Sequence, residues 1–379
     1  MKFLVLSCNT DNVHNSAAKA ICERIELSGH ECDFKDTFEY CSRTVYESVC
    51  DSYDEMSLHT PKVSGAGYRY AKSNRNNKSA VYALNMTYSK RIYNDVLENN
   101  YDAIICTHVF PAQSVTHAKH KYGLNIPVYI VATDYSYCPF YDEIDVDKFF
   151  VSTKEVIQEY TDRGIPEEKI IPTGIPVANC FSSFLTRDEA REILGLPKDR
   201  FICLIMSDCM EHGNIYELID KIIKKPLSQY DIIAITGNNH KLRCGILDKY
   251  YNYSNICTLG YTNKVHLYMK SSDLIITAPD GHSSTEAMVC GVPLILTAPI
   301  SGCETENYRL LTTLGIAIGG KETDDAVFGF ESILINKHVG EFLVCNMHKF
   351  INRNAAADIC NTIIGDLTKS QLNERKYIK

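Results

Sequence analysis

Short, nearly continuous apolar runs alternate with helical stretches along the whole 379-residue chain. The runs lie at 3–7, 103–107, 128–132, 149–151 and 170–172, and then at 201–206, 231–236, 256–259, 273–277 and 293–296. A run that is apolar at every position is typical of a parallel strand buried on both faces. Helical patterns lie between the runs, for example at 16–27, 81–99 and 214–224. This rhythm predicts an α/β protein with doubly wound sheets.

The rhythm restarts near position 200, and the chain length is typical of two domains. We expect a Rossmann-like domain over 1–176, a linker over 177–198 and a second Rossmann-like domain over 199–379. A T-x-x-E capping signal at Thr186 and Glu189 predicts a short helix within the linker. The tail from about 340 has helical patterning and fits either domain. Two such domains facing each other form a central cleft that receives ligands at the strands' carboxyl ends.

Charge and cysteine usage narrow the class of protein. The net charge of −8 argues against a general polyanion binder, so no nucleic-acid partner is expected. No apolar run is long enough to span a bilayer, and the one at the start is too short for a signal-peptide core. The sixteen cysteines are scattered without a CxxC pair, which predicts reduced thiols in a cytoplasmic protein and gives no spacing for a zinc site.

Seven segments carry a resemblance to a known family. In chain order they are LSCNTDNVHNSAAKAI, CTHVFPAQSVT, VATDYSYCPFY, IIPTGIPV, ITGNNHKL, LGYTNKVHLYMKSSDLIITAPDGHSSTEA and PLILTAPISGCETEN. Their order and spacing over roughly residues 1–320 resemble the processive diacylglycerol glycosyltransferases and monogalactosyldiacylglycerol synthases. The resemblance implies a two-domain GT-B fold that transfers a sugar from a UDP-sugar to a lipid hydroxyl without a required metal.

The resemblance assigns acceptor-side roles to three residues of the first half. His14 corresponds to the histidine that lies beside the acceptor hydroxyl, where a neutral imidazole accepts the hydroxyl proton. Asp134, after the run at 128–132, corresponds to a residue that supports this base or orients the acceptor. His108 is a further acceptor-side candidate. The alternatives are an ordinary polar contact for His14, an Asx turn or helix cap for Asp134 and a structural role for His108.

In the second half, the resemblance assigns contacts with the nucleotide sugar. Ser283 and Glu286 form an S-x-x-E capping box, which predicts the start of a helix whose amino end binds phosphate. Glu286 either reaches the ribose hydroxyls or only caps this helix. The nucleotide-binding set is Gly237, Asn238, Gly281, Ser283, Ser284, Thr285 and Glu286. Glu304 and Asn307 fall where the family contacts the donor sugar. A plain turn near Gly237 and a helix start at Glu304 are the alternatives.

Three loops depart from the glycine-rich pattern of the family. Asp11, Asn12 and Val13 precede His14, the second domain opens with SDCMEHG, and the third loop is APDG. Glycine lets backbone N–H groups approach a diphosphate, whereas carboxylates repel it. Asp208, Glu211 and Asp280 therefore weaken the phosphate site, unless they hold a Mg²⁺ ion that bridges them to the diphosphate or point away from the cleft.

Two main functions remain open from the sequence. The first is a UDP-sugar-dependent hexosyltransferase acting on a membrane lipid, attached peripherally to the inner membrane surface. Residues 52–80, rich in lysine, arginine and tyrosine, provide either the interfacial contact or a solvated polar loop. The second is a catalytically degraded relative that binds another ligand or a partner protein. A nucleotide-sugar epimerase would share this architecture, but the motifs of such enzymes are absent from the sequence. The oligomeric state is left open.

Overall fold

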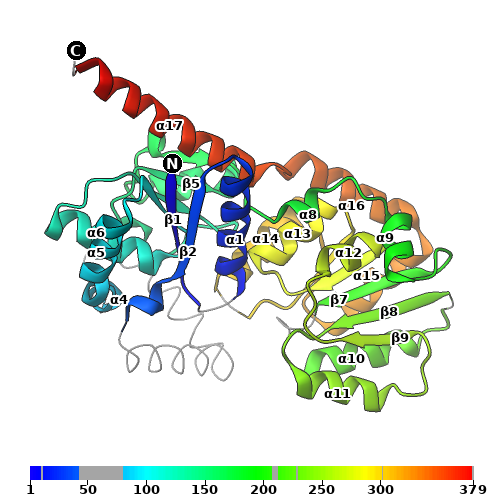
Figure 1. The fold of residues 1–379 in the computed structure, drawn as a ribbon. Helices are drawn as coiled ribbons and strands as arrows, with labels where there is room; N and C mark the ends of the chain where they lie inside the picture. The colour runs from blue at the N-terminus through cyan, green and yellow to red at the C-terminus, as the bar shows by residue number, and fades with distance from the viewer. Residues whose placement is uncertain (10–11, 42–79, 207–211, 228, 301, 378–379) are drawn as a thin grey trace. The chain divides into compact units, whose positions relative to one another are not determined.

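The computed structural model describes residues 1–9, 12–41, 80–206, 212–227, 229–300 and 302–377, which form two compact units (Figure 1). Unit 1 consists of Met1–Asn179, Ser301–Cys303 and Asn354–Lys379, and unit 2 of Cys180–Ile300 and Glu304–Arg353. The C-terminal segment of the chain is therefore divided, because its last helix belongs to the unit that also contains the N-terminus.

Unit 1 is built on a six-stranded parallel sheet in the order β2-β1-β3-β4-β5-β6. Its strands are β1 (Lys2–Ser7), β2 (Glu31–Asp36), β3 (Ala103–Cys106), β4 (Val128–Val131), β5 (Lys148–Val151) and β6 (Ile170–Pro172). Its α-helices are α1 (Asn12–Leu27), α4 (Ala80–Asn85), α5 (Ser89–Asn99), α6 (Val109–Tyr122), α7 (Ile157–Thr161) and α17 (Ala355–Tyr377). Single 3₁₀ turns occupy Thr37–Tyr40, Met86–Tyr88, Tyr141–Glu143, Lys154–Val156 and Glu167–Lys169.

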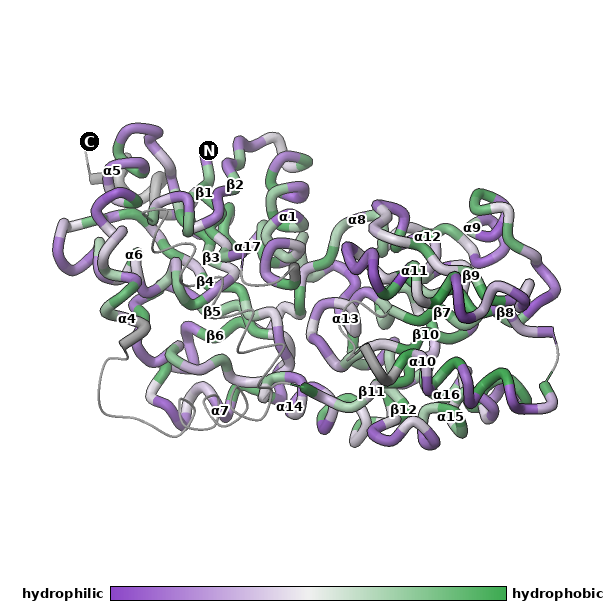
Figure 2. The backbone as a smooth tube through the Cα atoms, turned by 90° about the horizontal axis from the view of Figure 1, so that it is seen from below, coloured by the Kyte–Doolittle hydropathy of each residue, from purple (hydrophilic) through white to green (hydrophobic). Residues whose placement is uncertain are grey.

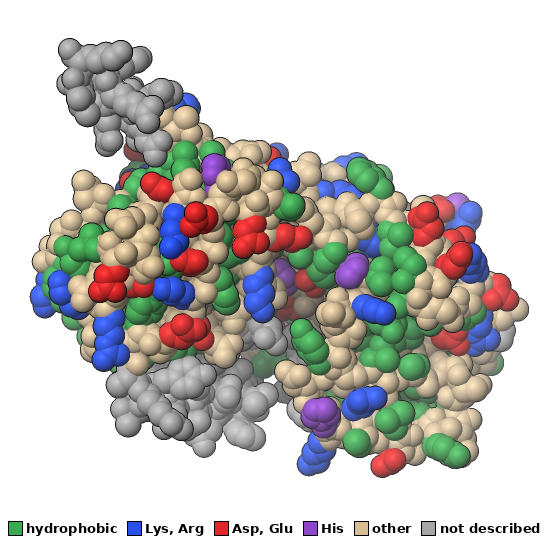
Figure 3. All heavy atoms as spheres, in the orientation of Figure 1, with side chains coloured by type: hydrophobic (Ala, Val, Ile, Leu, Met, Phe, Trp, Pro, Cys, Tyr) green, Lys and Arg blue, Asp and Glu red, His purple; other side chains and the backbone are tan. Residues whose placement is uncertain are grey.

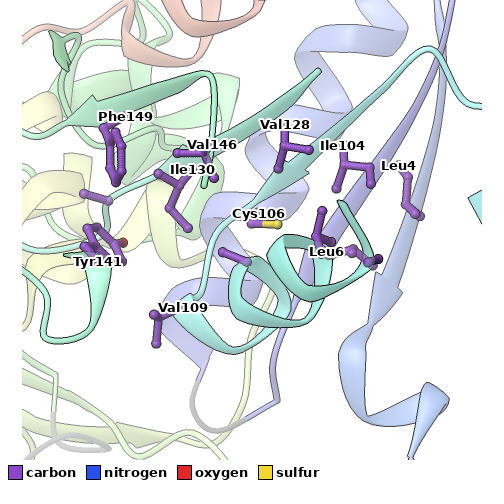
Figure 4. Packing of buried hydrophobic residues seen from close by; sticks show 14 of the residues in the cluster. Leu4, Leu6, Ile104, Cys106, Val109, Val128, Ile130, Tyr141, Val146 and Phe149 are labelled. Carbon is purple, nitrogen blue, oxygen red and sulfur yellow. The ribbon is translucent and has the colours of Figure 1, made fainter. Parts of the chain in front are cut away.

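The central strands of unit 1 alternate their side chains between two apolar layers. On one face Leu4, Ile104 and Val128 pack with residues from α5 and α6 (Figure 4). On the other face Val5 and Ile105 pack with residues from α1 and α17. Burial of both faces explains why β1 is apolar at positions 3–6, and why β3 and β4 have no charged residue.

Unit 2 contains a second six-stranded parallel sheet, in the order β12-β11-β10-β7-β8-β9. Its strands are β7 (Phe201–Met206), β8 (Tyr230–Ile235), β9 (Ile256–Leu259), β10 (Leu274–Thr277), β11 (Leu294–Thr297) and β12 (Ile318–Gly320). Its helices are α9 (Arg187–Leu194), α10 (His212–Ile223), α11 (His240–Lys249), α12 (Val265–Ser271), α13 (Gly281–Cys290), α14 (Gly302–Thr313), α15 (Thr323–Ile335) and α16 (Lys337–Phe350). The short helix α8 (Asn179–Ser182) lies where unit 1 passes into unit 2.

A buried arginine joins the first helix of unit 2 to its sheet. Arg191 is 1% exposed and donates to the backbone oxygens of Ser271 and Lys198 at 2.8 and 3.0 Å. Its Nη2 also lies 2.6 Å from the Asp273 carboxylate, which accepts from the backbone N–H of Ile202. One side chain thus fixes α9 against the end of α12 and the entry to β10.

The α/β class with doubly wound parallel sheets is confirmed. The strands are mainly hydrophobic along the chain trace in Figure 2. All ten predicted strands are present within one or two residues of their expected bounds, and the capping box of Thr186 and Glu189 opens α9 as predicted. The apolar pattern does not predict two strands, β2 and β12, and each of them is an edge strand of its sheet.

Acidic and basic side chains are interspersed on the face of each unit that is visible in Figure 3. This mixture agrees with the modest net charge of −8. Within the described ranges, no helix combines the length and the apolar composition needed to cross a bilayer.

Candidate active site

His14 lies in the first turn of α1, and the ends of two neighbouring strands hold its ring. Its Nδ1 lies 2.8 Å from the backbone oxygen of Thr107, which follows β3, and 3.0 Å from Oγ1 of Thr133, which follows β4. A carbonyl oxygen only accepts, so Nδ1 carries a proton. In a neutral imidazole the acceptor is then Nε2.

The same strand end also fixes the backbone of α1. Oγ1 of Thr107 donates to the backbone oxygen of His14 at 3.1 Å. Thr107 therefore contacts His14 twice, once through its own carbonyl and once through its hydroxyl. Because Thr107 is fully buried, this pairing sets the position of the imidazole with respect to the sheet.

His108 lies directly against His14, with ring centroids 4.5 Å apart in an edge-to-face arrangement. It is the N-cap of α6, where its Nδ1 accepts from the backbone N–H of Phe110 at 3.1 Å. Burial, together with the neighbouring His14, holds the pKa of His108 well below its usual value. The ring thus caps α6, and the acceptor-side role predicted for His108 stays a prediction.

Asp134 follows Thr133 in the segment after β4, and its side chain is partly buried. Its charge contributes to the raised pKa values of the buried Cys138 and Tyr160, so these groups lie within its electrostatic reach. Asp134 is therefore one residue from a side chain that contacts His14. Its predicted role as a support for the base or the acceptor stays a prediction.

The first loop of unit 1 leads directly into a helix. Because α1 begins at Asn12, Val13 has a helical conformation and does not need the left-handed backbone that a glycine loop uses. Asp11, the other departure from the glycine pattern here, lies outside the described residues.

In unit 2 the helix that was expected to bind phosphate is α13, but its cap differs from the prediction. The N-cap is Asp280, whose Oδ1 accepts from the backbone N–H of Ser283 at 2.7 Å. The predicted capping box of Ser283 and Glu286 is therefore wrong, because the helix begins two residues before Ser283. Asp280 comes three residues before Ser283, so its carboxylate takes the N–H that a phosphate would otherwise use.

The start of α13 is a buried polar site. Asp280 is 8% exposed, and Ser284 and Thr277 are fully buried. Among the residues that the structure describes, Oδ2 of Asp280, Oγ of Ser284 and Oγ1 of Thr277 have no hydrogen-bond partner. Burial raises the pKa of Asp280 to about 7. Unsatisfied buried oxygens cost free energy, so their gathering at a helix start is a feature to be explained.

Glu286 pairs with a histidine on its own helix. Nε2 of His282 lies 3.1 Å from Oε1 of Glu286, one turn apart, and both side chains are largely buried. Thr285, which is fully buried, donates to the backbone oxygen of Gly281 at 2.5 Å. Glu286 is thus oriented by His282 and is not the cap of α13. Contact of Glu286 with a ribose remains a prediction.

Glu304 and Asn307 both lie on α14, in different surroundings. Oε2 of Glu304 accepts from the backbone N–H of Ile300 at 2.6 Å, which fixes the start of the helix. Asn307 is fully buried and donates from Nδ2 to the backbone oxygen of Pro279 at 3.0 Å. Asn307 therefore holds the peptide that precedes Asp280. The sugar contacts predicted for both residues remain predictions.

Gly237 and Asn238 form the turn between β8 and α11. Gly237 has a positive φ of 52°, which glycine tolerates without strain, and Asn238 is exposed. The following Asn239 is the N-cap of α11 and accepts from the N–H of Leu242 at 3.0 Å. The turn follows a strand end as expected, and its contact with the nucleotide base stays a prediction.

The sequence reasoning did not single out Thr107, Thr133 or His282. Thr107 is the last residue of the predicted strand at 103–107 and Thr133 directly follows the one at 128–132, and polar residues at strand ends are candidates for a site. His282 lies four residues before Glu286, a spacing that places both on one helix face. These signals are present in the sequence.

A metal bridge is not tested at this site. Asp208 and Glu211 lie outside the described residues, so only Asp280 of the three predicted carboxylates is placed. Across the described part of the chain, no group of three or more His, Cys, Asp or Glu side chains is arranged to hold a metal ion.

Solved structures define the class of fold. Acinetobacter baumannii MurG matches 96% of this chain and 100% of its own, with a TM-score of 0.64 and 14% identity. The UDP co-structure of S. aureus MnaA matches 97% of both chains, with a TM-score of 0.62 and 14% identity. The UDP-GlcNAc 2-epimerase from Neisseria meningitidis matches at a TM-score of 0.61 and 13% identity, over 96% of this chain and 100% of its own. The fold is the GT-B fold, with two Rossmann-like units.

Sequence comparisons find relatives of the same family along nearly the whole chain. Residues 14–177 match the family model of monogalactosyldiacylglycerol (MGDG) synthase. The processive diacylglycerol beta-glucosyltransferase of Bacillus licheniformis is 25% identical over 99% of this chain and 97% of its own length. The enzyme of the same name from Bacillus cereus is 27% identical over 96% and 94%. The family resemblance that the sequence motifs predict is therefore confirmed.

Proposed function

We propose that the protein is a glycosyltransferase that moves a hexose from a UDP-sugar to a hydroxyl of a diacylglycerol-like membrane lipid. Similarity over nearly the full length to proteins named processive diacylglycerol beta-glucosyltransferase supports this substrate class. The single observation that carries the catalytic part is the fixed orientation of His14, whose Nδ1 is held by Thr107 and Thr133.

On the acceptor side, His14 acts as the general base. With its proton on Nδ1, the neutral ring uses Nε2 to accept the proton of the acceptor hydroxyl as that oxygen attacks the anomeric carbon of the donor. The Thr107 carbonyl keeps the ring in this tautomer, and the Thr133 hydroxyl contacts the same nitrogen. Asp134, next to Thr133 in the chain, orients the acceptor or supports the base. His108 packs against the ring of His14.

On the donor side, unit 2 binds the nucleotide sugar. The bond between the sugar and the diphosphate breaks, and the departing UDP gains negative charge that the amino end of α13 stabilises. Ser283, Ser284 and Thr285 lie in the first turns of this helix. Glu286, held by His282, reaches the ribose, Gly237 and Asn238 approach the base, and Glu304 selects the sugar.

The test compares sugar transfer from UDP-glucose to diacylglycerol in vesicles for the wild type and His14→Asn. The asparagine amide can still donate to the Thr107 carbonyl, but the variant has no ring nitrogen to act as a base. We expect the rate to fall by roughly 10²–10⁴-fold, with little change in the affinity for UDP-glucose. The matched control is His120→Asn, because His120 is an exposed histidine of the same unit.

Each outcome separates one part of the proposal. Unchanged turnover in His14→Asn removes the role of His14 as a base. Wild-type protein that neither binds UDP-glucose nor transfers glucose overturns the enzymatic function, and a binding role for another ligand then becomes the better account.

A further inference from the structure

The start of α13 has a carboxyl group where a donor phosphate is expected to bind. The first N–H groups of a helix have no partner within the helix and attract anions. In α13 one of them, the N–H of Ser283, is already taken by Oδ1 of Asp280 at 2.7 Å. The inference drawn here rests on the proposed function, since it concerns how this helix accepts the sugar nucleotide.

Asp280 cannot simply turn into solvent to make room. Its side chain is 8% exposed, and the peptide before it is held by the 3.0 Å hydrogen bond from the buried Asn307 to the Pro279 carbonyl. Ser284, in the first turn of the same helix, is fully buried. The carboxyl is therefore a fixed part of the surface that a phosphate meets at this helix.

Two oxygens at the helix start have unmet hydrogen-bonding capacity. Oδ2 of Asp280 and Oγ of Ser284 have no partner within the described part of unit 2. A buried hydroxyl is a donor that an anion can use. An ionised carboxylate, in contrast, is only an acceptor, so it repels a phosphate and offers it no hydrogen bond. A protonated carboxyl has one O–H to donate.

We propose that Asp280 is protonated whenever the sugar nucleotide is bound, and that its Oδ2–H donates a hydrogen bond to a phosphate oxygen, so that donor binding takes up one proton. Oδ1 keeps the N–H of Ser283 in both states. Asp280 then makes the affinity for the donor a function of pH, and it is a specificity element for a phosphate rather than a catalytic residue.

The electrostatic surroundings of Asp280 agree with this linkage. Burial raises its pKa to about 7, so the proton is available near neutral pH. On the same helix, His282 lowers the pKa of Asp280 and Glu286 raises it. On α12, His266 interacts with Glu286, and on α14 the Glu304 carboxylate accepts from the N–H of Ile300.

The size of the effect follows from the linkage. If only the protonated form accepts the phosphate, the apparent dissociation constant increases by the factor 1 + 10^(pH − pKa). With the Asp280 pKa at about 7, this factor is about 1.1 at pH 6 and about 11 at pH 8. The affinity for the donor should therefore fall about tenfold between these two pH values.

The experiment is isothermal titration calorimetry of the full-length protein with UDP-glucose at pH 6, 7 and 8. UDP-glucose is suitable because its diphosphate is esterified at both ends and does not titrate in this range, unlike the terminal phosphate of UDP. Measurements at pH 8 in two buffers of different ionisation enthalpy count the protons taken up. The variant Asp280→Asn keeps the capping oxygen and replaces the titrating group with a permanent donor. The control Asp325→Asn changes an exposed carboxylate in the first turn of α15.

For the wild type and Asp325→Asn we expect a roughly tenfold loss of affinity from pH 6 to pH 8, with uptake of nearly one proton at pH 8. For Asp280→Asn we expect nearly constant affinity, close to the wild-type value at pH 6, and no proton uptake by this group. Circular dichroism verifies that each variant is folded.

Two results overturn the inference in different ways. If the wild type binds UDP-glucose with the same affinity at all three pH values, or if Asp280→Asn keeps the pH dependence, Asp280 does not take up the proton and the proposed function stands. If UDP-glucose binds to neither the wild type nor Asp280→Asn at any pH, both the inference and the proposed function fail.

Discussion

Replacing Asp280 with asparagine should change how the stability of unit 2 depends on pH, even without a ligand. In the folded protein, burial raises the pKa of this carboxyl from 3.8 to about 7. Between these values the folded state holds a proton that the unfolded chain has lost. The stabilisation is therefore fully present below about pH 4 and is lost as the pH rises towards 7.

The magnitude follows from the shift. The difference 7 − 3.8 is 3.2 units, and each unit corresponds to about 1.4 kcal/mol, so the full effect is on the order of 4 kcal/mol. Between pH 5 and pH 8 about two of these units are lost, because the loss ends near the folded pKa of about 7. The free energy of unfolding therefore falls by roughly 3 kcal/mol over this range. Asparagine does not titrate and keeps a side-chain oxygen for the Ser283 N–H, so the variant should avoid this loss.

The assay is a urea titration at pH 5 and pH 8, read out by pulsed hydrogen–deuterium exchange of peptides from α13 and β10. This readout follows unit 2 alone, because two units can unfold separately. Relative to the wild type, Asp280→Asn should gain roughly 3 kcal/mol between pH 5 and pH 8. A difference that is the same at both pH values would refute the reasoning, and a variant that becomes relatively less stable at pH 8 would show that the helix dipole stabilises an ionised Asp280.

Two further substitutions each test an interaction inside one unit, the first in unit 2 and the second in unit 1. Arg191→Met removes the buried partner of Asp273, which keeps only the exposed Arg187 as a charged partner. The variant should destabilise unit 2 by about 3 kcal/mol in urea titrations, the low end of the range for a broken buried pair; a loss below about 1 kcal/mol would mean that the buried ion pair contributes little. His108→Asn keeps an acceptor for the Phe110 N–H but removes a ring that stays neutral in the folded state. Burial depresses the pKa of His108 in the folded state, so only the unfolded chain takes up a proton at this residue as the pH falls below about 6.5. Its contribution to the stability of unit 1 is lost over that range. Unit 1 of the variant should therefore lose less stability than the wild type between pH 7 and pH 5, and identical acid sensitivity would contradict this.

The sequence predicts every interior strand but only one edge of each sheet, because β6 and β9 have apolar runs whereas β2 and β12 do not. Strands such as β3 and β4 are buried on both faces, so every position must be apolar and the pattern is easy to recognise. Strand β2 has the sequence ECDFKD and is only partly buried, which leaves it without an apolar run. Strand β12 is three residues long and contains two glycines. Both are defined by pairing with a neighbour and not by their own composition.

The two T/S-x-x-E patterns show why local signals need the tertiary structure. At Thr186 and Glu189 both hydrogen bonds of the predicted capping box are present, one from each backbone N–H to the other residue's side chain. At Ser283 and Glu286 the same spacing lies inside a helix, because Asp280 three residues earlier is a good N-cap and accepts the Ser283 N–H. Glu286 then pairs with His282. Two overlapping cap signals compete, and the fold decides which one is used.

The family motifs allowed His14, Asp134 and the start of α13 to be identified as candidates from the sequence. Their chemical state was not in the motifs. The proton on Nδ1 of His14 follows from the carbonyl of Thr107, 93 residues away in the chain. The raised pKa of Asp280 follows from burial, and the position of its loop from Asn307 on another helix.

The sequence by itself determined the α/β class, the two Rossmann-like repeats and the family resemblance, because buried parallel strands and ordered motifs leave a direct trace in the order of residues. Only the tertiary structure decided that α17 packs on unit 1, where Ile359, Ile363 and Leu367 meet the layer of α1. It also decided the tautomer of His14 and the burial of Asp280. Hydrogen-bond partners and desolvation come from residues that are distant in the chain, so no local pattern specifies them.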